Sequence, residues 1–182
     1  MKRVIIVKNN NCENIIEKCS RCNISCNQKP LVDKLRKADI MFVGISAKIK
    51  ETEDEIPLSE NTNSGKLIKM IEERLLEENN NISCYRSNMV KCVPLDEEGK
   101  IRYPDILEIE NCIDNIVYEL SVVKPKVVVL LGRLVEKHLK KKIIEQGYNT
   151  ITIYHPSYIY VYRKKEIEKY VEESSKNILK YV

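Results

Sequence analysis

Apolar runs and amphipathic segments alternate along most of the chain. Four of the apolar runs predict strands, at residues 39–46, 84–92, 126–132 and 150–154. Apolar residues recur with helical spacing between and after these runs, over residues 67–76, 106–120, 133–147 and 167–179. Because strands alternate with helices, we expect an α/β protein, a three-layer α/β/α sandwich around a central, mainly parallel sheet.

Turn and capping residues support these boundaries. Residues 61–65 offer turn and cap chemistry before the first helix, and Asn79-Asn80-Asn81 ends it. Pro104 suits the first turn of the second helix, and Pro125 closes that helix. These residues mark where the first two predicted helices begin and end.

Length and composition fit a chain with one core. No repeat or linker interrupts the 182 residues, so we expect one domain over residues 1–182, with a cysteine-bearing segment at about residues 1–30 and a short strand at Val4–Val7. The net charge of +4 permits contact with nucleic acid but does not demonstrate it. The apolar run after Lys2-Arg3 is too short for a signal sequence, and no stretch is long enough to cross a membrane. We expect a cytoplasmic protein without membrane contact.

Cysteine usage indicates a bound metal centre. The chain has seven cysteines, and in an intracellular protein this odd number favours ligands and buried thiols over disulfides. Cys19 and Cys22 are two residues apart, and Cys92 and Cys112 flank the entry to a predicted helix. Two such pairs can close a tetrahedral or a cubane site, so an iron–sulfur cluster and a zinc ion both fit the spacing.

Several motifs occur in an order that resembles a known superfamily. They are Cys19-Ser-Arg-Cys22, Val43-Gly44, Pro57 with Ser64-Gly65-Lys66-Leu67-Ile68, Ser87-Asn88-Met89-Val90-Lys91-Cys92, Pro125 to Gly132, and His155-Pro156-Ser157-Tyr158. In this order they resemble the uracil-DNA glycosylases, most closely the iron–sulfur branch called family four. The resemblance runs from about Cys19 to Arg163, nearly the whole chain.

The resemblance implies a fold, a cofactor and a partner. The fold is a four-stranded parallel sheet with helices on both faces and a DNA groove across the carboxyl ends of the strands, and we expect a monomer. The cofactor is a structural [4Fe–4S] cluster, whose ligands by matching position are Cys19, Cys22, Cys92 and Cys112. The partner is DNA containing uracil or a damaged base.

Three cysteines have no counterpart in this match. They are Cys12, Cys26 and Cys84, which we interpret as buried or loop thiols. Cys26 is close enough to Cys22 in the sequence to compete with it as a ligand.

The implied reaction is hydrolysis of the N-glycosidic bond of uracil, or of a related damaged base, flipped out of DNA. His155, just past the last strand, would donate to the base O2 as negative charge develops there. The amide of Asn88 would read the uracil edge and reject cytosine. Each has a local alternative: His155 satisfied by a nearby hydrogen bond, and Asn88 bonded to its own strand edge.

The first motif departs from the family pattern. Where the iron–sulfur branch carries Gly-Glu-Ala-Pro-Gly, this chain has Gly44-Ile45-Ser46-Ala47-Lys48, with Gly44 and Ile45 at the base site. Ser46 can hold a water molecule but is a poor base, so Glu51 is our candidate carboxylate, with a solvated loop charge as its alternative. Leu58 replaces the family's phenylalanine and offers an apolar floor without a π face.

Two further segments are candidates for DNA contact. Lys48 suits a DNA phosphate, an amine nucleophile of depressed pKa, or plain solvent exposure. The segment from Tyr158 to Lys165 alternates tyrosines with aliphatic residues and ends in basic residues, which suits a wedge in the duplex or a strand or helix start packed on the core. The candidate DNA contacts are Tyr158, Tyr160 and Arg163 in this segment and Ser157 just before it.

The altered first motif leaves a second hypothesis open. The chain would then be a DNA-binding iron–sulfur protein of the same fold whose catalysis is lost or altered. Such a protein would bind DNA in a salt-dependent way and release no base.

Overall fold

The computed structural model describes residues 15–182, so Cys12 and the strand predicted at Val4–Val7 lie outside the described residues. Within residues 15–182, four strands form one sheet in the order β2-β1-β3-β4, with parallel pairing throughout. They are β1 (Ile40–Ser46), β2 (Cys84–Val90), β3 (Val127–Leu131) and β4 (Asn149–Ile153). The predicted strands and the α/β class are confirmed.

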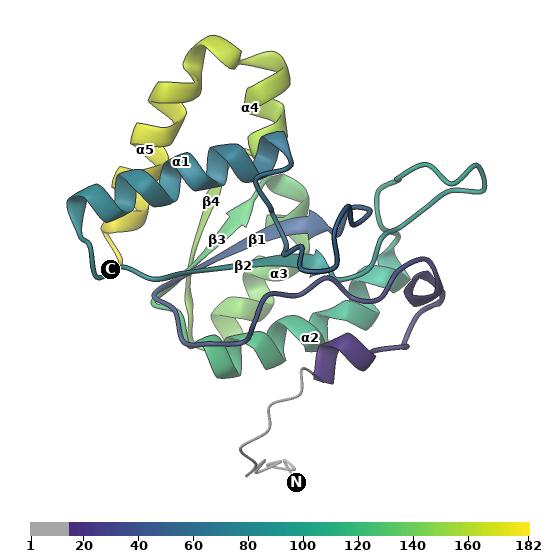
Figure 1. The fold of residues 1–182 in the computed structure, drawn as a ribbon. Helices are drawn as coiled ribbons and strands as arrows, with labels where there is room; N and C mark the ends of the chain where they lie inside the picture. Colours follow the sequence, from purple (N-terminus) through teal and green to yellow (C-terminus); the bar gives the residue numbers. More distant parts are fainter. Residues whose placement is uncertain (1–14) are drawn as a thin grey trace, which may run out of the picture.

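Helices cover both faces of the sheet, as Figure 1 shows. One face carries α1 (Asn63–Glu78), α4 (Pro156–Tyr162) and α5 (Ile167–Leu179), and the other carries α2 (Ile106–Val123) and α3 (Arg133–Glu145). Short 3₁₀ helices are found at η1 (Ile15–Lys18), η2 (Asn23–Cys26) and η3 (Lys164–Glu166). This arrangement is the predicted three-layer sandwich.

Strand alternation divides the apolar residues between the two layers. Ile40 and Phe42 of β1 pack with α1, whereas Met41 and Val43 pack with α2 and α3. All four side chains are fully buried, and burial of one such side chain contributes about 1.5–3 kcal/mol. Among residues 15–182, no helix combines the length and the apolar character needed to cross a bilayer.

Side-chain caps fix where two helices begin. Thr62 Oγ1 accepts a hydrogen bond of 2.9 Å from the backbone N–H of Gly65 at the start of α1. Asp105 and Glu108 form a capping box at the start of α2. Both first turns lie at the edge of the sheet where β1 and β2 end (Figure 1).

The carboxyl ends of the strands meet at this edge. Gly44 of β1 pairs with Asn88 of β2, and His155 follows the end of β4. After β3 the chain turns at Gly132, whose φ of +91° favours glycine and where an added Cβ would lie 3.1 Å from His155 Cβ. The turn therefore lets the backbone pass close to His155.

Candidate active site

A cavity of about 350 Å³ opens at the carboxyl ends of the strands. It is lined by residues from the segment before β1, from the ends of β1 and β2 and the loops that follow them, and from the starts of α1 and α4: Leu31, Ile45, Ser46, Ala47, Lys48, Leu58, Ser59, Thr62, Ser64, Asn88, Ile101, Arg102, Tyr103, His155 and Ser157. The structure therefore brings His155 and Asn88, 67 positions apart in sequence, to one cavity.

The Asn88 amide has no hydrogen-bond partner among the described residues. The residue is 3 % exposed, and its amide keeps its accessible area towards the cavity. Gly44 makes room for it, because a Cβ at position 44 would collide with Asn88 Oδ1. The cavity therefore contains a donor and an acceptor that a ligand can satisfy.

The His155 ring is held by the start of α4. His155 is the N-cap of this helix, and its Nδ1 accepts a hydrogen bond of 3.2 Å from the backbone N–H of Ser157. Ser157 Oγ lies 2.7 Å from the same nitrogen. Because a backbone N–H can only donate, Nδ1 is the acceptor and the proton of the neutral ring is on Nε2.

Burial lowers the pKa of His155 below its ordinary value. The ring is therefore neutral near pH 7, with Nε2–H as its free donor. The local hydrogen bond considered from the sequence does exist, but it occupies only one ring nitrogen and fixes the other as a donor.

Leu58 covers the cavity from the loop between β1 and α1. Its φ of 56° lies in the left-handed region, which costs a residue with a Cβ about 1–2 kcal/mol. Arg86 Nη1 donates a 2.8 Å hydrogen bond to the Leu58 carbonyl, and Arg86 is itself paired with Glu72 of α1. This ion pair holds the loop in its strained conformation beside Gly44.

The charges of the same loop pair with one another. Lys48 Nζ lies 2.8 Å from Glu55 and 3.2 Å from Glu51. Partial burial would lower the pKa of Lys48, but the two carboxylates outweigh it and raise the pKa. Burial would likewise raise the pKa of Glu55, yet Lys48 and Ser59 bring it down to about 2. An amine nucleophile of depressed pKa is therefore the wrong interpretation of Lys48.

The structure does not bring Glu51 into the cavity. Its side chain is 65 % exposed and pairs with Lys48. The buried carboxylate of this loop is Glu55 instead, which the sequence did not distinguish from the acidic residues around it. Among the described residues that line the cavity there is no aspartate or glutamate.

The opposite wall is built by the loop between β2 and α2. Arg102 pairs with Glu108 at the start of α2 and donates from Nε to the Leu95 carbonyl at 3.0 Å. Tyr103 lines the cavity next to Arg102 and is 73 % exposed. The sequence analysis missed both residues, because nothing in a polar loop indicates which side chains return to the site.

The segment after His155 is helical, which agrees with the helix-start alternative. Ser157 lines the cavity, whereas Tyr160 is partly buried against the core of the α1 face. Tyr158 and Arg163 are not among the described residues that line the cavity. Arg163 instead forms an ion pair with Glu166 at 2.8 Å. Tyr160 is thus placed for packing.

The four predicted cysteine ligands converge near the start of α2. Asn115 Nδ2 lies 3.7 Å from the sulfur atoms of both Cys19 and Cys112. The pKa of Cys92 is raised to about 12, first by burial and then by the charges of Cys112, Cys22 and Cys19. Between residues 15 and 182, however, no three His, Cys, Asp or Glu side chains form a group that could hold a metal ion.

The chemistry of this set fits a cationic centre. Burial alone would raise the pKa of Cys19, but hydrogen bonds from Arg21 and Asn115 lower it. Cysteines bind a metal centre as thiolates, and the N–H groups aimed at the Cys19 and Cys112 sulfur atoms would stabilise that charge beside a bound cationic cluster. The four cysteine donors therefore fit an iron–sulfur cluster by their chemistry, although they do not form a coordination geometry.

The other cysteines lie apart from this set. Cys26 is exposed. Cys84 begins β2, at the opposite end of that strand from Cys92. This position agrees with a thiol that is not a ligand.

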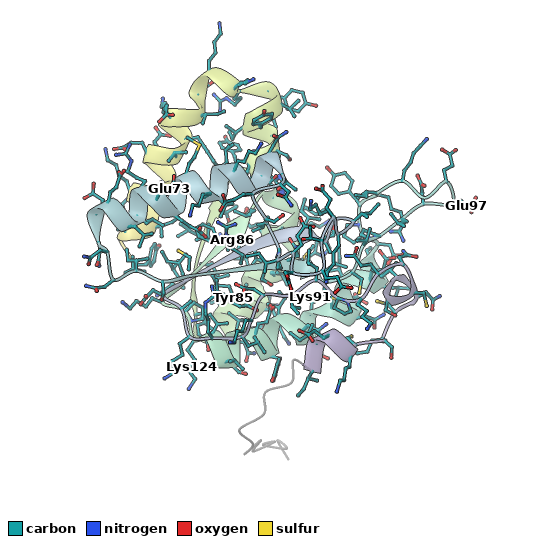
Figure 2. All side chains as sticks on the ribbon, in the orientation of Figure 1. Glu73, Tyr85, Arg86, Lys91, Glu97 and Lys124 are labelled. Atoms are coloured by element: carbon teal, nitrogen blue, oxygen red, sulfur yellow. The ribbon has the colours of Figure 1, made fainter. Side chains whose placement is uncertain are left out.

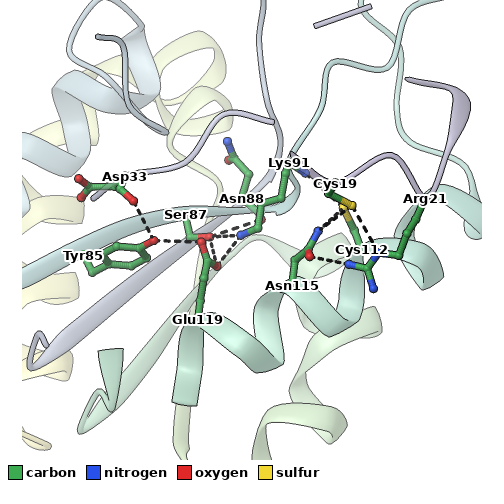
Figure 3. A network of polar contacts seen from close by, with 10 residues as sticks. All are labelled: Cys19, Arg21, Asp33, Tyr85, Ser87, Asn88, Lys91, Cys112, Asn115 and Glu119. Carbon is green, nitrogen blue, oxygen red and sulfur yellow. Dashed lines mark hydrogen bonds and ion pairs between the residues drawn. The ribbon is translucent and has the colours of Figure 1, made fainter. Parts of the chain in front are cut away.

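A buried polar network lies behind β2, on the side of α2 (Figure 3). Lys91 and Glu119 form an ion pair with both side chains 1 % exposed. Ser87 Oγ donates to Glu119 at 2.7 Å, and Tyr85 Oη donates to it at 3.0 Å. The backbone N–H of Lys91 also donates to Cys112 Sγ at 3.4 Å, so this network reaches the cysteines.

Figure 2 shows the two sides of β2 by their labelled residues. Arg86 extends towards α1, whereas Tyr85 and Lys91 lie on the side of α2. Asn88 has the same parity as Arg86, so its amide points away from the Lys91–Glu119 pair in Figure 3.

Comparisons with known proteins found a matching family model and a related sequence. The model of the uracil DNA glycosylase superfamily matches residues 32–178. A type-4 uracil-DNA glycosylase from Sulfurisphaera tokodaii is 32 % identical over 132 residues, which are 72 % of this chain and 56 % of the relative. The chain thus spans little more than half the length of that relative.

A solved structure has the same fold. The crystal structure of wild-type SMUG2 from Pedobacter heparinus matches with a TM-score of 0.60 and 17 % identity, over 78 % of this chain and 74 % of the other. At this identity the match describes the fold alone.

Proposed function

The chain belongs to the uracil-DNA glycosylase superfamily, and on that premise we propose that it is a DNA N-glycosylase that removes uracil or a related damaged base. The observation that carries this proposal is the meeting of the His155 ring and the unpaired Asn88 amide in one cavity. The His155 N–H can stabilise the negative charge that develops on the leaving base, and the Asn88 amide can form hydrogen bonds with the edge of that base.

His155 acts on the leaving group. Its Nε2–H donates to the base O2 as the glycosidic bond breaks and negative charge accumulates on the pyrimidine. Because the ring is already oriented by Ser157 and neutral, no proton has to be rearranged first. Removal of one such donor in other enzymes lowers kcat about 10²–10³-fold.

Asn88 selects the base. The amide oxygen accepts from the uracil N3–H, and the amide nitrogen donates to the neighbouring carbonyl oxygen. Cytosine presents the reverse pattern at this edge and would leave buried polar groups unpaired. Gly44 leaves room for the amide oxygen, and Leu58 lies beside the same glycine.

Water is the nucleophile, and this site activates it weakly. Ser46 lines the cavity at the end of β1 and can position a water molecule, but a serine hydroxyl is a poor base. Since no described acidic residue lines the cavity, hydrolysis depends mainly on stabilisation of the leaving base. We therefore expect slower turnover than a site with a water-activating carboxylate would give.

Cys19, Cys22, Cys92 and Cys112 are the proposed ligands of a structural [4Fe–4S] cluster. The cluster would brace the loops beside the cavity without entering the chemistry. Iron and sulfide analysis of anaerobically purified protein tests this assignment, with zinc in place of iron as the contradictory result.

The function is tested with uracil-containing single- and double-stranded oligonucleotides, with abasic sites as the readout. We expect cleavage by the wild type and a loss of about 10²–10³-fold in His155→Ala. Salt-dependent DNA binding without release of any base, by protein with its metal centre intact, would favour the second hypothesis of a binding protein.

A further inference from the structure

One hydroxyl group of the cavity wall is bonded to a buried carboxylate. Ser59 lines the candidate active site from the loop between β1 and α1, and its Oγ donates a 2.5 Å hydrogen bond to Glu55 Oε1. The Glu55 side chain is 1 % exposed and is not among the described residues that line the cavity. Ser59 therefore connects the cavity to a carboxylate that lies behind its wall.

Glu55 is held in its charged form. Lys48 Nζ lies 2.8 Å from Glu55 Oε1, and the backbone N–H of Glu51 donates to Glu55 Oε2 at 2.8 Å. A charged carboxylate can only accept hydrogen bonds, so the Ser59 proton must point at Glu55. No other described residue donates to Ser59 Oγ, so the lone pairs of this oxygen are available to a molecule in the cavity.

The other serine and threonine hydroxyls of the cavity wall lack this arrangement. The hydroxyl of Thr62 is used by the start of α1, and that of Ser157 is bonded to the neighbouring histidine ring. Ser46 and Ser64 make no side-chain hydrogen bond with another described residue, so their hydroxyls can rotate. Among these hydroxyls, Ser59 alone has a proton directed at a carboxylate.

The position of Ser59 is fixed by its neighbours. Its carbonyl accepts hydrogen bonds from the backbone N–H of Thr62 at 3.1 Å and from Thr62 Oγ1 at 2.9 Å. A Cβ at Gly65 of α1 would lie 1.9 Å from the same carbonyl oxygen, so the loop and the helix are in close contact. The preceding residue is Leu58, whose left-handed backbone is held by Arg86. Strain of this kind persists where the surroundings over-determine a conformation, and it is concentrated at functional sites.

We propose that Ser59 contacts the attacking water molecule as a catalytic residue, with Glu55 behind it as a positioning residue and proton acceptor. As the water oxygen bonds to the sugar C1′, the C1′–N1 bond breaks and its electron pair leaves with the base. The water gives one proton to Ser59 Oγ while Ser59 gives its own to Glu55, and solvent then carries that proton to the released base.

A weak base is sufficient for this step. The transition states of glycosidic bond hydrolysis place positive charge on the sugar, and water that adds to such a carbon loses its proton readily. Lys48 also contacts Glu55, but an ammonium group has no lone pair with which to take a proton. This inference rests on the proposed function and adds to the stabilisation of the leaving base.

The test measures excision of uracil from a single-stranded oligonucleotide and separates kcat from KM. Ser59→Ala and Glu55→Gln should each lower kcat about tenfold, less than the roughly 10²–10⁴-fold effect of a directly placed general base, and change KM by less than about twofold. Because Glu55 acts through Ser59, the double variant should lose no more kcat than Ser59→Ala alone.

A substrate with a better leaving group separates this role from that of His155. Fluorine at C5 of uracil withdraws electrons and stabilises the departing anion, so 5-fluorouracil should recover part of the rate that His155→Ala loses. The loss in Ser59→Ala should be the same on both bases, because the fluorine does not change the water molecule.

Two variants serve as controls. Ser59→Thr keeps the hydroxyl group and should retain most of the rate. Ser121→Ala removes an exposed serine of α2 that bonds to the Tyr118 carbonyl, and it should change neither kcat nor KM. Every variant is assayed below its melting temperature, measured by circular dichroism.

Three outcomes overturn the proposal. They are an unchanged kcat in Ser59→Ala, a further loss of kcat when Glu55→Gln is added to Ser59→Ala, and recovery of the Ser59→Ala rate on 5-fluorouracil, which would place Ser59 on the base. Each of these would contradict this inference alone, because the wild type still excises uracil. A wild type that removes neither base would contradict the proposed function, and this inference with it.

Discussion

Ser87 and Asn88 are neighbours on β2 but belong to two different environments. Ser87 faces α2, where Glu119, Lys91 and Tyr85 satisfy one another within a buried network. Asn88 faces the cavity, where its amide has no hydrogen-bond partner among the described residues. One residue is completed by the protein, and the other is left for a ligand.

This difference separates stability from function in the same strand. A satisfied buried network holds a backbone in place, whereas a polar group that faces a cavity without a protein partner gives binding energy when a ligand arrives. The network behind β2 therefore supports the position from which Asn88 would contact the proposed base.

The largest effect is expected from Lys91→Met. It leaves the Glu119 carboxylate buried without its counter-ion, which should lower the free energy of unfolding by about 3–5 kcal/mol. Denaturant unfolding measures the loss, and the double variant Lys91→Met/Glu119→Leu should recover most of it. A double variant as unstable as the single one would mean that packing, not charge, determines the cost.

A smaller contrast is expected between Ser87→Ala and Asn88→Leu. The first removes a hydrogen bond to a charged group and should cost about 1.5–3 kcal/mol of stability. The second replaces an unpaired amide by an apolar group of similar shape and should leave stability unchanged or raise it, while abolishing excision. Equal destabilisation by both would show that Asn88 has a structural partner.

Gly44→Ala should act first on Asn88, with Leu58 Cδ2 as the next atom that its methyl group meets. Its methyl group would displace the amide, at an overpacking cost near the lower end of about 1–3 kcal/mol. Discrimination between uracil and cytosine should weaken more than stability does. The measurement is the ratio of kcat/KM on the two bases, and an unchanged ratio would contradict the role given to Asn88.

The smallest effect is the pH dependence of His155. Its pKa is lower in the folded protein than the ordinary histidine value of about 6.5, so its contribution to stability is fully present above that value and is lost as pH falls through the folded pKa. The difference in unfolding free energy between the wild type and His155→Ala should therefore decrease below about pH 6.5. A difference that grows on acidification would mean that the folded state prefers the charged ring.

Much of the fold was accessible from the sequence because its signals are local. The fully apolar run of β3 and the helical spacing of Leu67, Ile71 and Leu75 each require burial, whatever surrounds them. The helix α4 was less certain, because Tyr158, Tyr160 and Tyr162 alternate as the residues of one strand face do, while Tyr158 and Tyr162 are also spaced by one helical turn. Only packing on the core decides between these periods.

The site was partly predictable for a similar reason. His155 and Asn88 stand at or near strand ends, and the carboxyl ends of parallel strands meet at one edge. The pairing of Lys48 with Glu55, and the return of Tyr103 to the cavity, depend on how two polar loops fold over that edge. No periodicity encodes such loop conformations.

The bond between Ser157 N–H and His155 Nδ1 couples a helix end to an acid–base group. Unwinding the first turn of α4 would release that nitrogen and allow the ring proton to change sides. A ligand that stabilises α4 from outside must therefore also favour the tautomer with the proton on Nε2. By reciprocity, a base bound in the cavity must raise the affinity of α4 for that ligand.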